Sequence, residues 1–188
     1  MNLVRQIWAG LRLILVLTVV LGLLYPLAGV AFGKVMSDSA TGSLITVDGS
    51  VVGSTVIGQQ FDGDKWFIPR PSASTYDAMA SGGSNLGPNN PDLVTEIAAR
   101  KLQVAQRESV APDQVPADAV TASGSGLDPA ISVEYATLQV PRVARARGLP
   151  QERVRDLVEQ ATAPAGLGVL GEPSVNVLEL NLALEQAQ

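Results

Sequence analysis

The sequence predicts an α+β protein in which a single N-terminal transmembrane helix precedes one extracytoplasmic α+β domain. Three observations support this fold class: a long uncharged stretch near the N-terminus, a hairpin signal after it, and several amphipathic helical patterns further along. The 188 residues leave room for one ordinary domain beyond the membrane. We expect a cytoplasmic tail over 1–12, the transmembrane helix over 13–33 and the domain over 34–188.

The membrane segment is the uncharged run "LILVLTVVLGLLYPLAGVAFG", from Leu13 to Gly33. As a helix it spans about 31 Å, close to the roughly 30 Å of hydrocarbon in a bilayer. Because Pro26 cannot donate to the carbonyl of Gly22, we expect a kink there. A signal peptide cleaved after Ala31 is the alternative, but its apolar core would be only about 7 to 15 residues long.

Basic residues give the orientation of this helix. Arg5 and Arg12 precede it and Lys34 follows, so the positive-inside rule favours a cytoplasmic N-terminus. We therefore expect a single-pass protein of the cell membrane with its C-terminal domain outside. Beyond position 34 there are ten basic residues and all eighteen acidic ones, a formal charge of −8.

In the first part of the domain the sequence predicts a hairpin followed by irregular chain. "GSLITVDGSVVGSTVIG" places two short β runs around Asp48-Gly49, a strong turn signal. "KWFIPRPSA" is expected to be extended, because Pro69 and Pro71 restrict the residues before them. A loop rich in glycine, serine and asparagine then runs from Tyr76 to Pro91.

The first helix of the domain is predicted to begin at Asn90-Pro91, an N-cap followed by proline, and to end near Glu108. Glu96 and Arg100 form a favourable i,i+4 pair on the solvent-facing side of this helix. Its predicted buried face consists of Val94, Ile97, Ala98, Leu102 and Ala105.

Three more segments have residue patterns that predict helices. One is capped by Ser132 and stops at Gly148, and Pro141 is expected to kink or divide it. The next begins at Pro150 and buries Val154, Leu157, Val158 and Ala161. Residues 175–186 alternate as a strand does, yet Asn176 with Glu179 resembles a capping box, so a helix is favoured there.

Residue types exclude most catalytic chemistry. The chain has no cysteine and no histidine, which removes the thiol nucleophile, the usual general base and the common transition-metal ligands. No phosphate-binding glycine loop is present, and neither Ser123 nor Ser125 has the flanking residues of a nucleophile elbow. We therefore predict no catalytic residue, no metal site and no enzyme activity of its own, and the acidic charge disfavours nucleic acid.

One basic patch, "QVPRVARARG", stands out. Gln139, Arg142, Arg145 and Arg147 are candidates for contact with a nucleotide or an acidic partner. The alternative is a solvated helix face whose cations complement the helix dipole.

Several motifs in order resemble one family. "SGGSNLGPNNPDL", "VTASGSGLDPAIS", "QVPRVARARG" and "LGEPSVNVLELNLALE" are together similar to the C subunit of the Kdp-type potassium-transporting ATPase. The anchor ending in "YP", then "GSLI", "GQQF" and "RPSASTYD", fits the same family. The resemblance covers essentially the whole chain.

The resemblance implies a non-catalytic accessory subunit of an ATP-driven, high-affinity potassium uptake system. Family members are described as needed for assembly and as catalytic chaperones that raise the nucleotide affinity of the ATPase subunit. The implied partners are a potassium-channel-like subunit, a P-type ATPase subunit and, as a further candidate, a small membrane peptide. ATP and potassium would be handled by those partners, so no cofactor of this chain is expected.

Small and polar residues supply the candidate partner contacts. These are Gly22, Gly29, Arg70, Ser84, Asn85, Leu86 and Asn176. Arg70 is expected to bond a carboxylate or carbonyl, and Asn85 to form local backbone hydrogen bonds. Two other hypotheses stay open: an anchored binding module unrelated to transport, and an anchored hydrolase, for which no nucleophile–base pair is present.

Overall fold

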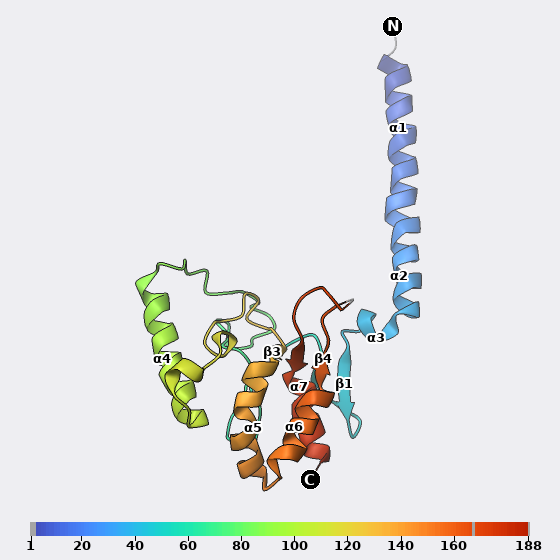
Figure 1. The fold of residues 1–188 in the computed structure, drawn as a ribbon. Coiled ribbons are helices and arrows are strands. Elements are labelled where there is room, and N and C mark those ends of the chain that lie inside the picture. The colour runs from blue at the N-terminus through green and yellow to red at the C-terminus, as the bar shows by residue number, and fades with distance from the viewer. Residues whose placement is uncertain (1–2, 167, 188) are drawn as a thin grey trace. The chain divides into compact units, whose positions relative to one another are not determined.

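The computed structural model describes residues 3–166 and 168–187. The chain divides into two compact units, Met1–Leu44 and Ile45–Gln188. Figure 1 shows the long helix of the first unit and the mixed helices and strands of the second. The predicted fold class, an apolar N-terminal helix followed by an α+β body, is confirmed.

The N-terminal unit is one helical rod with a short helix after it. It consists of α1 (Leu3–Val19), a π-helical turn η1 (Val20–Leu24), α2 (Tyr25–Val35) and α3 (Ser37–Ala40). Leu3–Val35 is the one helix among the described residues that is long and apolar enough to cross a membrane. Within its most apolar stretch no residue is buried.

The helix changes its hydrogen-bond register just before Pro26. The amide of Tyr25 donates to the carbonyl of Val20, five residues back instead of four. Because Pro26 cannot donate, the backbone ladder has to be rearranged in this region, and the π turn is where that happens. The structure shows a π turn within a continuous helix at this point, and the expected kink stays a prediction.

The predicted hairpin is confirmed. Strands β1 (Leu44–Val47) and β2 (Ser50–Ser54) pair around Asp48 and Gly49, whose φ angles are 50° and 78°. Two consecutive left-handed residues make the type I′ turn that suits the twist of a two-residue hairpin. Only glycine and residues such as aspartate adopt this geometry readily.

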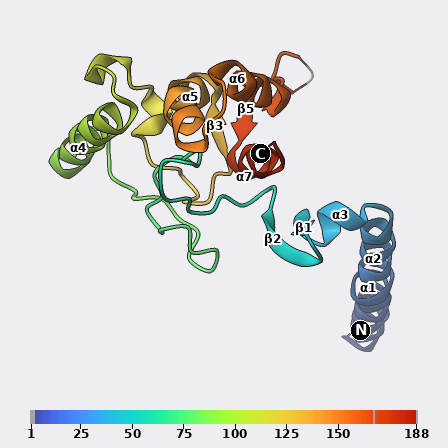
Figure 2. The same ribbon diagram turned by 90° about the horizontal axis from the view of Figure 1, so that it is seen from below.

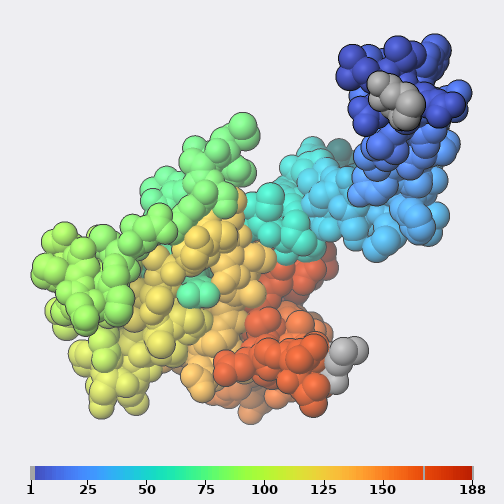
Figure 3. Space-filling model, turned by 90° about the horizontal axis from the view of Figure 1, so that it is seen from above, coloured from blue at the N-terminus to red at the C-terminus, as the bar shows by residue number. Residues whose placement is uncertain are grey.

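Helix α4 (Pro91–Glu108) begins as predicted, because the Asn90 side chain accepts a hydrogen bond of 2.8 Å from the amide of Asp92. Its predicted buried face is partly wrong. Val94 and Leu102 are 58% and 56% exposed and Ala98 is exposed too, whereas the last turns bury Val104, Ala105 and Glu108. Figures 2 and 3 show the reason: α4 lies at one edge of the domain, so only part of its surface is covered.

A small antiparallel sheet was not anticipated. Strands β3 (Ala130–Ser132), β5 (Ser174–Asn176) and β4 (Thr162–Ala163) lie in the order β3-β5-β4. Ile131 is paired with Val175, and both side chains are buried. Strands of two or three residues are too short for an alternating pattern to appear in the sequence.

Helices α5 (Val133–Arg147), α6 (Gln151–Gln160) and α7 (Val177–Gln186) follow the predicted boundaries. Ser132 caps α5, and Gly148 ends it with a φ of 68°. Of the two outcomes expected at Pro141, division does not occur, because α5 continues through it, and a kink stays a prediction. Two short 3-10 turns, Pro112–Gln114 and Ala117–Ala119, connect α4 to the sheet region.

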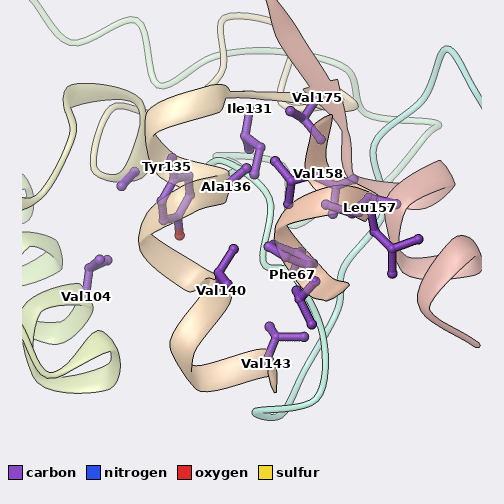
Figure 4. Packing of buried hydrophobic residues seen from close by; sticks show 14 of the residues in the cluster. Phe67, Val104, Ile131, Tyr135, Ala136, Val140, Val143, Leu157, Val158 and Val175 are labelled. Carbon is purple, nitrogen blue, oxygen red and sulfur yellow. The ribbon is translucent and has the colours of Figure 1, made fainter. Parts of the chain in front are cut away.

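The core lies where α5, α6 and α7 meet the small sheet. Phe67, Ile131, Val140, Val154 and Leu180 are almost fully buried there. Figure 4 shows Phe67, from an irregular segment, among side chains of the helices, and Tyr135 on the side of α5 that faces Val104. As predicted, Val154, Leu157 and Val158 form the buried face of α6, while Ala161 is only half-buried.

Candidate functional site

Residues 64–68 form a turn followed by irregular chain with no neighbouring strand among the described residues, and side chains hold this segment in place. Asn181 accepts from the amide of Phe67 at 2.9 Å and donates to the carbonyl of the same residue at 3.0 Å. Gln139 bonds the amide and carbonyl of Ile68 in the same way, at 2.7 and 3.1 Å. Two side-chain amides thus satisfy buried backbone groups that a β-ladder would otherwise satisfy.

Arg142 completes this network from within α5. Its Nε donates to both oxygens of Glu108 at 2.9 and 3.1 Å, and its Nη1 donates to the carbonyls of Asp64 and Trp66. Its Nη2 donates to Gln139 at 2.7 Å. Glu108 and Arg142 are each 7% exposed, so this ion pair joins α4 and α5 inside the protein, and the Arg142 bonds to Asp64 and Trp66 attach the 64–68 segment to it.

Arg147 is used similarly one turn later. Its three nitrogens donate to the carbonyls of Lys65 and Leu184 and to the carboxylate of Glu185. Its guanidinium carbon lies 4.6 Å from the centre of the Trp66 ring, a cation–π arrangement. For Arg142 and Arg147 the solvated-face interpretation is wrong, and Arg145 alone of the three arginines is exposed. Direct contact with a nucleotide stays a prediction that these internal contacts disfavour.

Two glycine-rich loops, residues 72–83 and 123–127, are bonded to each other, and we call them the loop pair. The amide of Gly82 donates to the carbonyl of Ser125 at 2.8 Å, and the amide of Ser123 donates to Pro71 at 2.9 Å. The hydroxyl of Ser72 donates to the carbonyl of Gly126 at 2.7 Å.

Because glycine has no side chain, the two loops can approach each other this closely. A Cβ atom on Gly126 would lie 2.8 Å from the carbonyl oxygen of Gly82, and one on Gly83 would lie 3.0 Å from that of Gly124. Gly126 also has a φ of 70°, which other residues adopt only at a cost. The glycine and serine motifs quoted above therefore join two loops that lie far apart in sequence.

Arg70 lies at the base of the loop pair. It forms an ion pair of 2.9 Å with Asp128 and donates to the carbonyl of Thr121 at 3.4 Å, so its predicted carboxylate and carbonyl contacts are confirmed. The hydroxyl of Tyr76 donates to the carbonyl of Arg70.

The other candidate contact residues of the 76–91 loop are less constrained. Asn85 has a left-handed backbone with a φ of 54°, but its side chain has no hydrogen bond to any described residue. Ser84 is exposed beside it, and Leu86 is half-buried. The predicted local bonds of Asn85 are thus absent from the described part of the chain, and its contribution to the loop is its backbone conformation.

The remaining candidates lie elsewhere. Asn176 caps α7, accepting from the amides of Leu178 and Glu179, and donates to the carbonyl of Thr55 at 2.7 Å. Gly22 lies in the π turn and Gly29 in α2, both on the exposed surface of the apolar helix.

Exposed apolar side chains continue along the hairpin after the helix. Val51 and Val56 are 60% and 59% exposed, and Val52 and Ile57 are each 37% exposed. Side chains of this kind follow one another along a short segment, which is typical of contact surfaces more than of isolated surface residues.

A cleft of about 250 Å³ lies between α4, α5 and the irregular chain of residues 60–71. Sequence reasoning did not identify it, because Arg70 comes from irregular chain, whereas Arg100 and Arg107 come from α4. Arg70, Arg100 and Arg107 line it together with the rings of Tyr76 and Tyr135. The Arg107 Nη2 donates to the hydroxyl of Tyr135 at 2.8 Å.

Burial sets the protonation of the two tyrosines in this cleft. It raises the pKa of both Tyr76 and Tyr135, and the cations beside them offset this only in part. Burial lowers the pKa of Arg107, but Tyr135 and Glu108 beside it outweigh that effect and the net direction is upward. The phenols therefore stay neutral and the guanidinium stays charged at physiological pH.

Comparison with known proteins identifies the family. The family model described as "KdpC: K+-transporting ATPase, c chain" matches residues 7–186. A potassium-transporting ATPase KdpC subunit of Kineococcus radiotolerans is 54% identical over 188 residues, which cover 99% of this chain and 96% of that protein. Proteins of the same name from Xanthomonas oryzae and Mycobacterium bovis are 51% and 50% identical, covering 89% and 97% of this chain and 80% and 98% of their own length. The chain belongs to the KdpC family, the c chain of the K+-transporting ATPase.

Proposed function

We propose that the chain is a non-catalytic accessory subunit of an ATP-driven potassium pump, needed for assembly and stability of the complex. The observation that supports this role is the apolar helix Leu3–Val35, whose most apolar stretch has no buried residue. Small residues at Gly10, Gly22 and Gly29 would let helices of other subunits approach closely in lipid. The exposed apolar hairpin provides further contact surface outside the helix.

The proposed partners are a potassium-channel-like subunit and a P-type ATPase subunit, with a small membrane peptide as a third. In this arrangement residues 13–33 cross the membrane, residues 1–12 lie in the cytoplasm and residues 34–188 lie outside. ATP hydrolysis and potassium passage belong to the partners, and no metal ligand cluster is present among the described residues of this chain.

Any increase in ATP affinity is proposed to be indirect. Gln139, Arg142 and Arg147 form hydrogen bonds within the protein and are buried, which supports a role in positioning α5 instead of binding phosphates. A subunit that contacts two pump conformations unequally shifts their populations, and a coupling of about 1 to 3 kcal/mol is typical. The outer domain and the membrane helix would supply that unequal contact.

Replacing Gly22 by leucine is expected to reduce copurification of the partner subunits with this chain. A Cβ atom there would lie 3.9 Å from Cγ2 of Thr18, an ordinary contact, so the helix itself tolerates a side chain. A loss of assembly would therefore arise from a neighbouring subunit. The measurement is the amount of each partner that copurifies in detergent, normalised to the amount of this chain.

Val16→Leu is the matched control, because it changes an exposed apolar residue of the same helix without filling a small-residue position. It should leave the yield of the complex unchanged. Equal recovery of the partners with Gly22→Leu and Val16→Leu would contradict helix packing at Gly22.

A further inference from the structure

The cleft between α4, α5 and the irregular chain of residues 60–71 brings three guanidinium groups together. Arg70, Arg100 and Arg107 line it, and Asp62 is the one carboxylate among its described lining residues. The side-chain amide of Gln60 donates to both oxygens of Asp62, at 3.0 and 3.2 Å. Counted alone, the lining carries a formal charge of +2, and with Glu96, Glu108 and Asp128, which pair with its arginines, the count is −1.

Each of these arginines forms an ion pair with a carboxylate that lies outside the cleft lining. Arg100 pairs with Glu96 at 2.9 Å, Arg107 pairs with Glu108 at 2.7 Å, and Arg70 pairs with Asp128. None of the three carboxylates lines the cleft. Guanidinium groups anchored in this way are oriented before a ligand arrives, which lowers the entropy cost of binding.

Each cleft arginine also retains one nitrogen without a partner among the described residues. In Arg70 it is Nε, which is buried and has no hydrogen-bond acceptor. In Arg100 and Arg107 it is Nε and Nη1, respectively, because the bonds of these residues use their other nitrogens. The buried arginines Arg142 and Arg147 differ, since all three of their nitrogens donate to protein acceptors.

We propose that this cleft binds a small free oxyanion, of which inorganic phosphate is the test case. The guanidinium groups supply charged donors in the planar geometry that phosphate and carboxylate oxygens match. At about 250 Å³ the cleft is smaller than the roughly 300 to 1,000 Å³ that accommodate drug-sized ligands, which favours a single oxyanion over a nucleotide.

Isothermal titration of the full-length chain in detergent with sodium phosphate tests the proposal, with sodium chloride of equal ionic strength as the blank. We expect saturable binding that Arg100→Gln weakens roughly tenfold or more, because a hydrogen bond to a charged group is lost. Arg145→Gln, which removes an exposed arginine outside the cleft, should leave the affinity unchanged. Arg100 is the preferred position because its partner Glu96 is largely exposed and needs no buried compensation.

A thermal melt provides a second measurement on the same samples. Phosphate should raise the melting temperature of the unmodified chain and of Arg145→Gln, but not that of Arg100→Gln. Titration heats and melting temperatures in phosphate that equal those in the sodium chloride blank would overturn the proposal. ATP binding much tighter than phosphate and lost in Arg100→Gln would overturn the assignment to a small ion. The inference does not rest on the proposed function, because the chain is tested without its partners.

Discussion

Replacing Arg142 by alanine lowers the free energy of unfolding of the domain by about 3 to 5 kcal/mol, the cost of breaking a buried ion pair by removing one partner. The substitution leaves Glu108, whose side chain is fully buried, with Arg107 as its remaining cation. It also removes the donors to the carbonyls of Asp64 and Trp66, so the segment at residues 64–68 loses part of its attachment to α5.

Urea unfolding of the full-length chain in detergent measures this effect, followed by the fluorescence of Trp66. The chain has two tryptophans, so Trp8→Phe in all samples leaves Trp66 as the only reporter. Arg145→Ala is the control, because this exposed arginine of the same helix should change stability by less than about 0.5 kcal/mol. Equal unfolding midpoints for the two variants would show that the Arg142 network contributes little to stability.

Alanine at Gly126 is expected to separate the loop pair. Its Cβ would overlap the carbonyl of Gly82 and the side chain of Ser74, and the backbone φ of 70° becomes unfavourable. The conformational cost is roughly 1 to 2 kcal/mol and the overlap costs roughly 1 to 3 kcal/mol more. Hydrogen exchange should show lost protection at the amides of Gly82 and Ser123, which bond across the two loops.

Gly124→Ala is the matched control for this experiment. It lies in the same loop, but a Cβ there meets nothing within 4 Å. Protection at Gly82 and Ser123 should survive in this variant, and protection in α6 should survive in both. Full protection of the two amides in Gly126→Ala would contradict the close backbone contact between the loops.

Local rules predicted the elements whose signals lie within a few residues. Asn90, Ser132 and Asn176 cap the helices that they were expected to cap, and Asp48-Gly49 forms the expected turn. These features depend on backbone geometry and one side chain, so tertiary packing does not override them.

Features that depend on distant residues were not predictable in this way. The exposed Val94 and Leu102 show that helical spacing gives a face of α4 but not how much of the domain covers it. The burial of Arg142 depends on Glu108, which is 34 positions away. A basic motif in the sequence looks the same whether its partners are solvent, a ligand or a buried carboxylate.

The cleft was missed for the same reason. Arg100 and Arg107 lie two turns apart on α4, but Arg70 belongs to irregular chain before the helix, so no local pattern indicates that all three meet. For the loop pair, the sequence showed only the motifs rich in glycine and serine. The motifs indicated close backbone approach, but the chain segment that approaches could not be read from them.

Labelling of a single cysteine tests the account most directly. The chain contains no cysteine, so Arg145→Cys introduces a unique thiol at an exposed position of the domain. If the domain lies outside the cell and influences ATP affinity only through the assembled pump, a membrane-impermeant maleimide will label this thiol in intact cells as fully as in permeabilised ones. Labelling that appears only after permeabilisation would place the domain in the cytoplasm and contradict the account.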